Sequence, residues 1–269
     1  MDEYVAAPVP DLLRPYLAAL EGYRITGAEP GIHVGMPSRH LTIIITLDDG
    51  IDVASNDPKS RPTRFAALVA GLHAEPAHIH HDGNQFGLQL SLTPAGARAL
   101  LGAPAAQFQS GSVPLADVLG PLGTRIRERV GSARTWPERF AVVTQELAAI
   151  VDGGAVIEAP VRRAWKLLAR SRGGIPIGAV AQDVGWSARH LTDRFAREFG
   201  PTPKLAGRMM RFERSRALIG RAALADIAIR CGYADQSHLV RDWRQFAGAS
   251  PTQWLRGDTL ARRGEATGG

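Results

Sequence analysis

The stretch CGYADQSHLVRDWRQFAGASP, residues 231–251, has the pattern of a glycine turn followed by a capped helix. Gly232 can adopt the left-handed backbone conformation that ends a helix, and Asp235 is of a residue type that caps the start of the next one. Leu239 and Trp243 are four residues apart, which places them on one face of that second helix. The stretch therefore predicts a turn and a short helix with one buried face.

The same pattern occurs earlier in the chain. Residues 177–208 match residues 224–256 at an offset of 47 residues up to the glycine and 48 residues after it. Each copy begins with apolar residues spaced i, i+3, i+4 and i+7, which is typical of one face of a short helix. In the first copy Gly185 is the turn glycine and Ser187 is the capping residue. Helix, glycine turn and capped helix is the pattern of a helix-turn-helix unit, so the repeat predicts two such units.

The segments around the two units also have helical patterns. We predict a longer helix over residues 204–219 between the units, a leading helix over 161–168 and a short last helix from about Pro251. Cys231 occupies an apolar position of the repeat, so we expect it in the core, with a redox role as the alternative. The large aromatic residues expected in the same core are Trp165, Trp243 and Trp254.

Charge is divided unevenly along the chain, whose net charge is +6. Residues 1–160 hold 12 Lys+Arg and 17 Asp+Glu, so 12 − 17 = −5. Residues 161–269 hold 20 Lys+Arg and 9 Asp+Glu, so 20 − 9 = +11. A basic half that contains two helix-turn-helix units indicates a polyanionic partner.

Residues 160–257 resemble the C-terminal DNA-binding domain of the AraC family of transcriptional regulators. The first stretch that carries the resemblance is GYADQSHL at residues 232–239, with Trp243, Phe246, Gly248, Ser250 and Pro251. The second is RFERSR at residues 211–216, followed by Leu218 and Ile219, which resembles the family's linker helix. The resemblance implies a sequence-specific DNA-binding transcription regulator that binds double-stranded DNA and is controlled by a small-molecule effector. It also implies a second copy of the chain and RNA polymerase as further partners.

The expected fold is an α+β chain of two domains. The N-terminal domain, residues 1–155, is expected to be a β-rich sensor and dimerisation domain with closing helices, and the resemblance suggests a cupin-like barrel. The C-terminal domain, residues 160–257, is expected to be all-α with the two helix-turn-helix units. Residues 258–269 then form a tail, and residues 152–160 form the linker between the domains.

The expected DNA contacts lie on the outward positions of the second helix of each unit, because residues near the start of such a helix read base edges in the major groove. In the first unit these positions are Arg189, Thr192, Asp193 and Arg197, and in the second unit they are Gln236, Ser237, Val240 and Arg241. Arg208 and Arg244 are expected to contact phosphates. For any single arginine the alternative is a solvated helix face.

Among these residues, the family resemblance points to Arg189, Thr192 and Asp193 as base readers. Arg189 can bind guanine through two hydrogen bonds, Gln236 can bind adenine, and Val240 can contact a thymine methyl group. Family members often carry a basic residue at the position of Asp193. Two roles therefore stay open for Asp193, which are acceptance of a hydrogen bond from cytosine and an ion pair with Arg189 or Arg197.

The first half has strand signals followed by helix signals. Strands are predicted over residues 41–47, 65–72 and 85–92, where the last has the alternating pattern of a strand with one buried face. Helices are predicted over residues 95–101, over 115–130 with an interruption at Gly120-Pro121, and over 136–151. The apolar stripe of the last helix can face either its own domain or a second protomer.

Four histidines cluster in this half, namely His73, His78, His80 and His81. If residues 77–81 form a strand, His78 and His80 share one face and have the arrangement of a metal-binding pair. The interpretation we favour is a polar loop between strands, and we predict no metal, cofactor or catalytic residue. An enzyme or metal-binding β domain fused to a DNA-targeting module is the alternative function.

Composition excludes other classes of protein. The single cysteine permits no internal disulfide and no cysteine-based zinc site. We find no stretch of about 20 apolar residues, so no membrane-spanning helix is expected. The N-terminus carries Asp2 and Glu3 and lacks the apolar core of a signal peptide, so a cytoplasmic location is expected.

Overall fold

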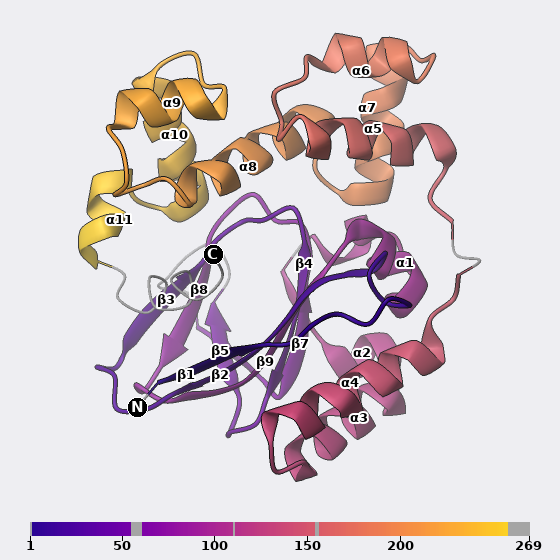
Figure 1. The fold of residues 1–269 in the computed structure, drawn as a ribbon, viewed down its shortest axis with the longest axis vertical. Helices are drawn as coiled ribbons and strands as arrows, with labels where there is room; N and C mark the ends of the chain where they lie inside the picture. Colours follow the sequence, from indigo (N-terminus) through magenta and orange to yellow (C-terminus); the bar gives the residue numbers. More distant parts are fainter. Residues whose placement is uncertain (1, 55–60, 110, 154–155, 258–269) are drawn as a thin grey trace.

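The structure is a computed structural model that describes residues 2–54, 61–109, 111–153 and 156–257. A β-rich N-terminal part lies beneath a helical C-terminal part (Figure 1). This arrangement confirms the predicted α+β fold of two parts. Residues 258–269, the predicted tail, lie outside the described residues, and the domain boundaries at 155 and 160 remain a prediction. Among the residues described, no helix has the length and apolar character needed to cross a membrane.

The larger sheet has six antiparallel strands. Its strands, in spatial order, are β1 (Glu3–Ala6), β2 (Leu17–Ile25), β9 (Gln85–Leu92), β4 (Leu41–Thr46), β7 (Ala67–Ala70) and β10 (Ser112–Pro114). Ile43 of β4 lies opposite Leu90 of β9, and both are buried in the main core. The predicted alternation of β9 is thus confirmed, because its leucines share one face.

The smaller sheet packs on one face of the larger sheet. Its four strands are β3 (Gly31–Gly35), β8 (Ala77–His81), β5 (Ile51–Ala54) and β6 (Thr63–Phe65). A second, smaller core lies between the sheets, where Ile44 and Leu68 pack with Ile79 and Phe65. Residues on the two faces of β4 therefore pack in different cores, with Ile43 in the main core and Ile44 in the smaller one.

The chain changes sheet within the segment that we predicted as one strand. Residues 65–72 form the end of β6 and the whole of β7, with a break at Ala66. β6 pairs with β5 of the smaller sheet, whereas β7 pairs with β4 of the larger one. The Ala66 carbonyl accepts a hydrogen bond of 2.7 Å from the Thr46 hydroxyl, which holds the corner. The prediction of a single strand is therefore wrong, because the apolar run does not reveal the corner.

Helices cover the larger sheet on the face opposite the smaller sheet. They are α1 (Pro94–Leu101), the short 3₁₀ helix η1 (Ala105–Phe108), α2 (Leu115–Leu119), α3 (Pro121–Ser132) and α4 (Trp136–Ile150). The predicted interruption between α2 and α3 is confirmed at Gly120, whose φ is 60°. Phe140, Val143 and Leu147 of α4 are buried in the main core, so the stripe of α4 faces its own chain.

The C-terminal part consists of helices, as predicted. They are α5 (Ala159–Arg170), α6 (Ile177–Asp183), α7 (Ala188–Phe199), α8 (Pro203–Arg216), α9 (Leu224–Cys231), α10 (Gln236–Ala247) and α11 (Pro251–Gly257). In Figure 1, α8 runs between one lobe that contains α5, α6 and α7 and a second that contains α9, α10 and α11. Cys231, Trp243 and Trp254 are buried and Trp165 packs against the core, which confirms the predicted core positions.

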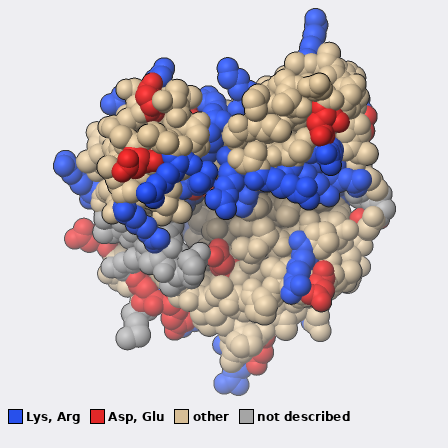
Figure 2. All heavy atoms as spheres, turned by 45° about the horizontal axis from the view of Figure 1, so that its top comes forward, with Lys and Arg blue, Asp and Glu red and all other residues tan. Residues whose placement is uncertain are grey.

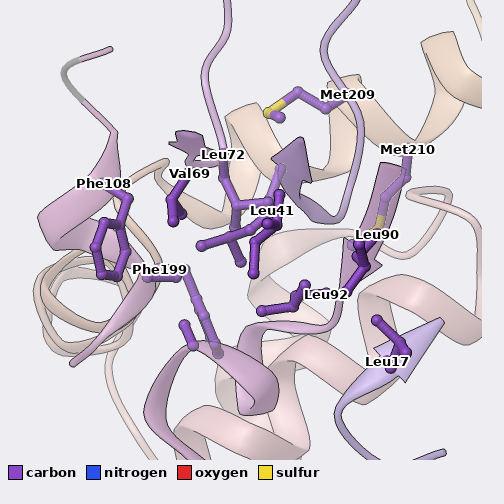
Figure 3. Close-up of a cluster of buried hydrophobic side chains, with 14 of the residues drawn as sticks. Leu17, Leu41, Val69, Leu72, Leu90, Leu92, Phe108, Phe199, Met209 and Met210 are labelled. Atoms are coloured by element: carbon purple, nitrogen blue, oxygen red, sulfur yellow. The ribbon is translucent and has the colours of Figure 1, made fainter. Parts of the chain in front are cut away.

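The two parts of the chain share one continuous apolar core. The residues that meet from the two sides include Phe199, Met209 and Met210 of the helical part and Leu41, Leu72 and Phe108 of the β-rich part (Figure 3). Phe199 is fully buried. The acidic and basic halves of the chain are thus joined by a packed apolar core. The sequence did not predict this contact between them.

Candidate nucleic-acid interface

Each of the two helix-turn-helix units is held by the turn and cap that the sequence predicted. Gly185 and Gly232 have φ values of 73° and 77°, in the left-handed region that favours glycine. The Ser187 hydroxyl accepts a hydrogen bond of 3.2 Å from the His190 backbone N–H. In the second unit the Asp235 carboxylate accepts one of 2.7 Å from the His238 N–H. These caps fix where α7 and α10 begin.

The buried faces of α7 and α10 determine which residues point outwards. Leu191 and Phe195 of α7 are fully buried, and so are Leu239 and Trp243 of α10. The indole N–H of Trp243 donates a hydrogen bond of 2.9 Å to the Ser215 hydroxyl of α8, which satisfies this buried polar group. Both second helices are therefore anchored on one side and open on the other.

The outward side of α7 carries the residues predicted to meet DNA. Arg189, Asp193 and Arg197 are exposed and lie at intervals of four residues, so they form one stripe along the helix. Thr192 is half-buried, and its hydroxyl donates to the Ala188 carbonyl oxygen at 2.8 Å. Within the described chain Asp193 forms no ion pair with Arg189 or Arg197. Its carboxylate is thus free to accept a hydrogen bond.

The outward side of α10 has less charge near its start. Gln236, Ser237, Arg241 and Arg244 are exposed, and Val240 is half-buried. The Arg241 Nε donates to the Ser237 carbonyl oxygen at 3.4 Å, which directs the guanidinium along the helix surface. The two helices consequently present different chemistry near their starts, with an arginine and a carboxylate on α7 and an amide, a hydroxyl and an apolar side chain on α10, whose arginines follow later.

Arg208 differs from the other candidates because its guanidinium forms an ion pair with a buried carboxylate of the protein. Its Nη2 lies 2.7 Å from an Asp242 carboxylate oxygen and 2.6 Å from the Gln245 side-chain oxygen. The Asp242 carboxylate is buried, so this ion pair holds α8 against α10. Any contact of Arg208 with phosphate would have to coexist with these bonds.

Basic side chains gather over the helical part (Figure 2). Several of them form ion pairs that brace the first unit. Arg163 of α5 pairs with Asp183 at 2.7 Å, and Arg194 of α7 pairs with Glu158 at 2.5 Å. Basic residues with such partners stabilise the fold, whereas the outward stripe of α7 presents its charge to solvent.

Two ion pairs between the β-rich part and the helices α7 and α8 were not predicted. Arg98 of α1 forms two hydrogen bonds, of 2.7 and 2.6 Å, with the carboxylate of Glu198 in α7. Glu213 of α8 lies 3.6 Å from the Arg39 guanidinium. Because these partners are far apart in the sequence, no local pattern could reveal them. The first pair connects the β-rich part to α7, the helix expected to read DNA, and the second connects it to α8.

The histidine cluster does not have the structure that we favoured. Residues 77–81 form strand β8, which pairs with β3 on one side and β5 on the other, so the prediction of a polar loop is wrong. Ile79 is buried between the sheets, and His78 and His80 lie on the opposite face of the strand. Among the described residues no group of three or more potential metal ligands comes together.

Comparison with known proteins finds a matching domain model and solved structures of similar fold. Residues 180–257 match the model of a helix-turn-helix domain. The structure is similar to ToxT from Vibrio cholerae, with a TM-score of 0.52 at 9% identity over 89% of this chain and 99% of ToxT. ToxT bound to (E)-4-(8-methylnaphthalen-1-yl)but-3-enoic acid matches with a TM-score of 0.50 at 11% identity, over 88% of this chain and 98% of that one.

Two further solved structures match the helical part. The DNA-binding domain of AdpA, in complex with a target DNA, is 21% identical over 39% of this chain and 97% of its own, with a TM-score of 0.35. A transcriptional regulator from Chromobacterium violaceum, described as containing an AraC-type DNA-binding domain, is 20% identical over 38% of this chain and 93% of its own, with a TM-score of 0.34. Comparison with curated protein sequences finds no significant match.

Proposed function

Because residues 180–257 match the model of a helix-turn-helix domain, we propose that this protein is a sequence-specific DNA-binding transcription regulator. The observation that carries the proposal is the pair of capped helices, α7 and α10, each buried on one face and open on the other. They lie in the half of the chain whose net charge is +11, by the count 20 − 9. Such charge attracts the DNA backbone, while side chains on the open faces read bases.

In this proposal α7 and α10 enter neighbouring segments of the major groove on one side of the duplex. Arg189 binds guanine and Gln236 binds adenine, each through two hydrogen bonds. Asp193 accepts a hydrogen bond from cytosine, Val240 contacts a thymine methyl group, and Arg244 contacts phosphate. Because the two helices differ in chemistry, the preferred site is asymmetric.

We further propose that a small-molecule effector bound to the β-rich part controls DNA binding. ToxT, whose fold this chain shares, has been solved with an organic acid bound, which supports a ligand of this kind. The route of control is the junction at the back of α7, where Glu198 pairs with Arg98 and Phe199 enters the shared core. A shift of α1 would therefore move the recognition helix.

The same proposal includes a second copy of the chain and RNA polymerase as further partners. It also includes a cytoplasmic location. The alternative is an enzyme or metal-binding domain fused to a DNA-targeting module; among the described residues no group of three or more potential metal ligands comes together.

The test is selection of binding sites from random duplex DNA by the full chain, followed by titration of the selected duplex. We expect a defined sequence in two segments, and an affinity that falls steeply with salt because binding releases counterions. Glu29→Gln, which changes an exposed charge in the β-rich part, is the control and should leave the affinity unchanged. Selection without enrichment, or binding insensitive to salt, would contradict the proposal.

A further inference from the structure

Arg211 of α8 contacts the turn that leads into the first helix-turn-helix unit and the turn inside the second unit. Its Nη1 donates a hydrogen bond of 2.6 Å to the carbonyl oxygen of Gly173, in the turn between α5 and α6 that precedes the first unit. Its Cζ lies 5.5 Å from the centre of the Tyr233 ring, in the turn between α9 and α10 of the second unit. Its Cδ also lies 3.5 Å from where a Cβ on Gly232 would be. A single side chain thus bridges the turn before the first unit and the turn inside the second unit.

The first of these turns has little freedom to move. Gly173 has a φ of 76°, which favours glycine, and a Cβ at this position would overlap the carbonyl group of Gly207. The backbone of the turn therefore lies directly on α8, one helical turn before Arg211. The hydrogen bond from Arg211 is charge-assisted and fixes the turn in that place.

The second turn is packed as closely. Tyr233 is buried, with 5% of its surface exposed, and its ring receives the flat guanidinium as a cation–π contact. Gly232, next to it, takes the left-handed conformation on which the helix-turn-helix geometry depends. Arg211 therefore contacts the second unit at the hinge between its two helices.

Within each unit, the recognition helix is braced separately. Arg163 and Arg194 tie α5 to α6 and α7 to the start of α5, and Arg208 ties α10 to α8. The relation of one unit to the other is then set along α8, which both units contact. DNA recognition by two units requires a fixed relation between them, because successive major-groove segments lie about 34 Å apart on one face of the duplex.

We propose that Arg211 is a positioning residue that sets the spacing and orientation of α7 relative to α10. The protein thereby discriminates the distance between the two DNA segments that it reads. This inference rests on the proposed function, since it concerns how two DNA-reading helices act together. Arg211 itself faces the two turns and contacts no base.

The first experiment measures affinity of the full chain for the selected site and for versions with one, two or three base pairs inserted between its segments. The wild type should lose about tenfold for the first insertion, which is the effect of losing one base contact. Arg211→Met should bind the original site more weakly and show a spacing profile that is nearly flat. Arg214→Met removes the same charge from the same helix and should lower all affinities by one common factor.

A second experiment measures the inter-unit distance directly and needs no DNA. Spin labels on Arg197→Cys of α7 and Arg244→Cys of α10, in a Cys231→Ala background, report the distribution of distances by pulsed electron resonance. Arg211→Met should broaden this distribution, while Arg214→Met should leave its width unchanged. Arg211→Lys keeps the charge and a donor for the Gly173 carbonyl but lacks the flat face, so it should give intermediate results and replaces Arg211→Met if the latter fails to fold.

Parallel spacing profiles for wild type and variant, together with equal distance distributions, would overturn the positioning role while leaving the regulator proposal standing. A wild type that binds no duplex would overturn the regulator proposal and this inference with it. A wild type that binds all spacings equally would overturn the inference alone.

Discussion

Removal of Arg98 should destabilise the protein more than removal of its partner, Glu198. The two side chains form a bidentate ion pair between α1 and α7, but their surroundings differ, because 33% of the Arg98 side chain is exposed and only 9% of the Glu198 side chain is. Arg98→Met leaves a nearly buried carboxylate without its cation. Glu198→Gln leaves a cation that can reach water.

The expected magnitudes follow from this asymmetry. Breaking a fully buried pair by removing one partner costs about 3–5 kcal/mol, and exposed pairs contribute about 0–1 kcal/mol. Because Arg98 is one-third exposed, we expect Arg98→Met to lower the free energy of unfolding by about 2 kcal/mol, between those limits. Glu198→Gln should cost about 1 kcal/mol or less, since it keeps a neutral hydrogen-bonding group. The double variant should be no less stable than Arg98→Met.

The assay is equilibrium unfolding of the full chain in urea, with the four proteins of a double-mutant cycle. A loss of about 2 kcal/mol corresponds to a fall in melting temperature of roughly 4–8 °C for a chain of this size. Arg14→Met is the matched control, because Arg14 and Asp11 form an ion pair at the surface. A larger loss for Glu198→Gln than for Arg98→Met, or strictly additive losses in the double variant, would refute the reasoning.

Three further outcomes are expected. Arg189→Ala should cost about 1–3 kcal/mol of DNA affinity and relax the preference at one base pair, whereas Arg244→Ala should weaken all duplexes alike, as titration at fixed salt would show. Gly173→Ala should lower the urea midpoint, because its φ is 76° and the new methyl group would meet the Gly207 carbonyl; an unchanged midpoint would argue against the close approach. Burial, with a neighbouring arginine, lowers the pKa of His40 to about 4 from 6.5. As the pH falls through this window the unfolded chain takes up a proton first, so the free energy of unfolding should decline between pH 6.5 and 4 and His40→Gln should flatten that decline.

The helical half could be predicted because its signals are local. Turn glycines, capping residues and apolar spacing act within a few residues, and the repeat showed the same pattern twice. Gly232 and Asp235 have the conformation and the hydrogen bond that their residue types favour. The stripe on α7 could be predicted for the same reason, because Leu191 and Phe195 determine which side is buried.

The features that could not be predicted depend on contacts between residues that are distant in the sequence. Strand β8 has histidines where a strand usually carries apolar or β-branched residues, and it forms because β3 and β5 pair with it from both sides. The corner at Ala66 likewise depends on a hydrogen bond with Thr46, 20 residues away. Arg98 and Glu198 are 100 residues apart, so neither their pairing nor the junction behind α7 could be inferred from local patterns.

The apolar core that continues from the β-rich part into the helical part bears on how this chain can be divided and recombined. A fragment cut at the predicted linker would expose Phe199, Met209 and Met210, which are buried in the intact chain. The fragment would therefore present an apolar patch that favours aggregation. A chimera that joins this DNA-reading half to a foreign sensor would need complementary side chains for the same three residues. Exchange of parts between such proteins is therefore constrained by the fit of their shared interior as well as by the sequence of the linker.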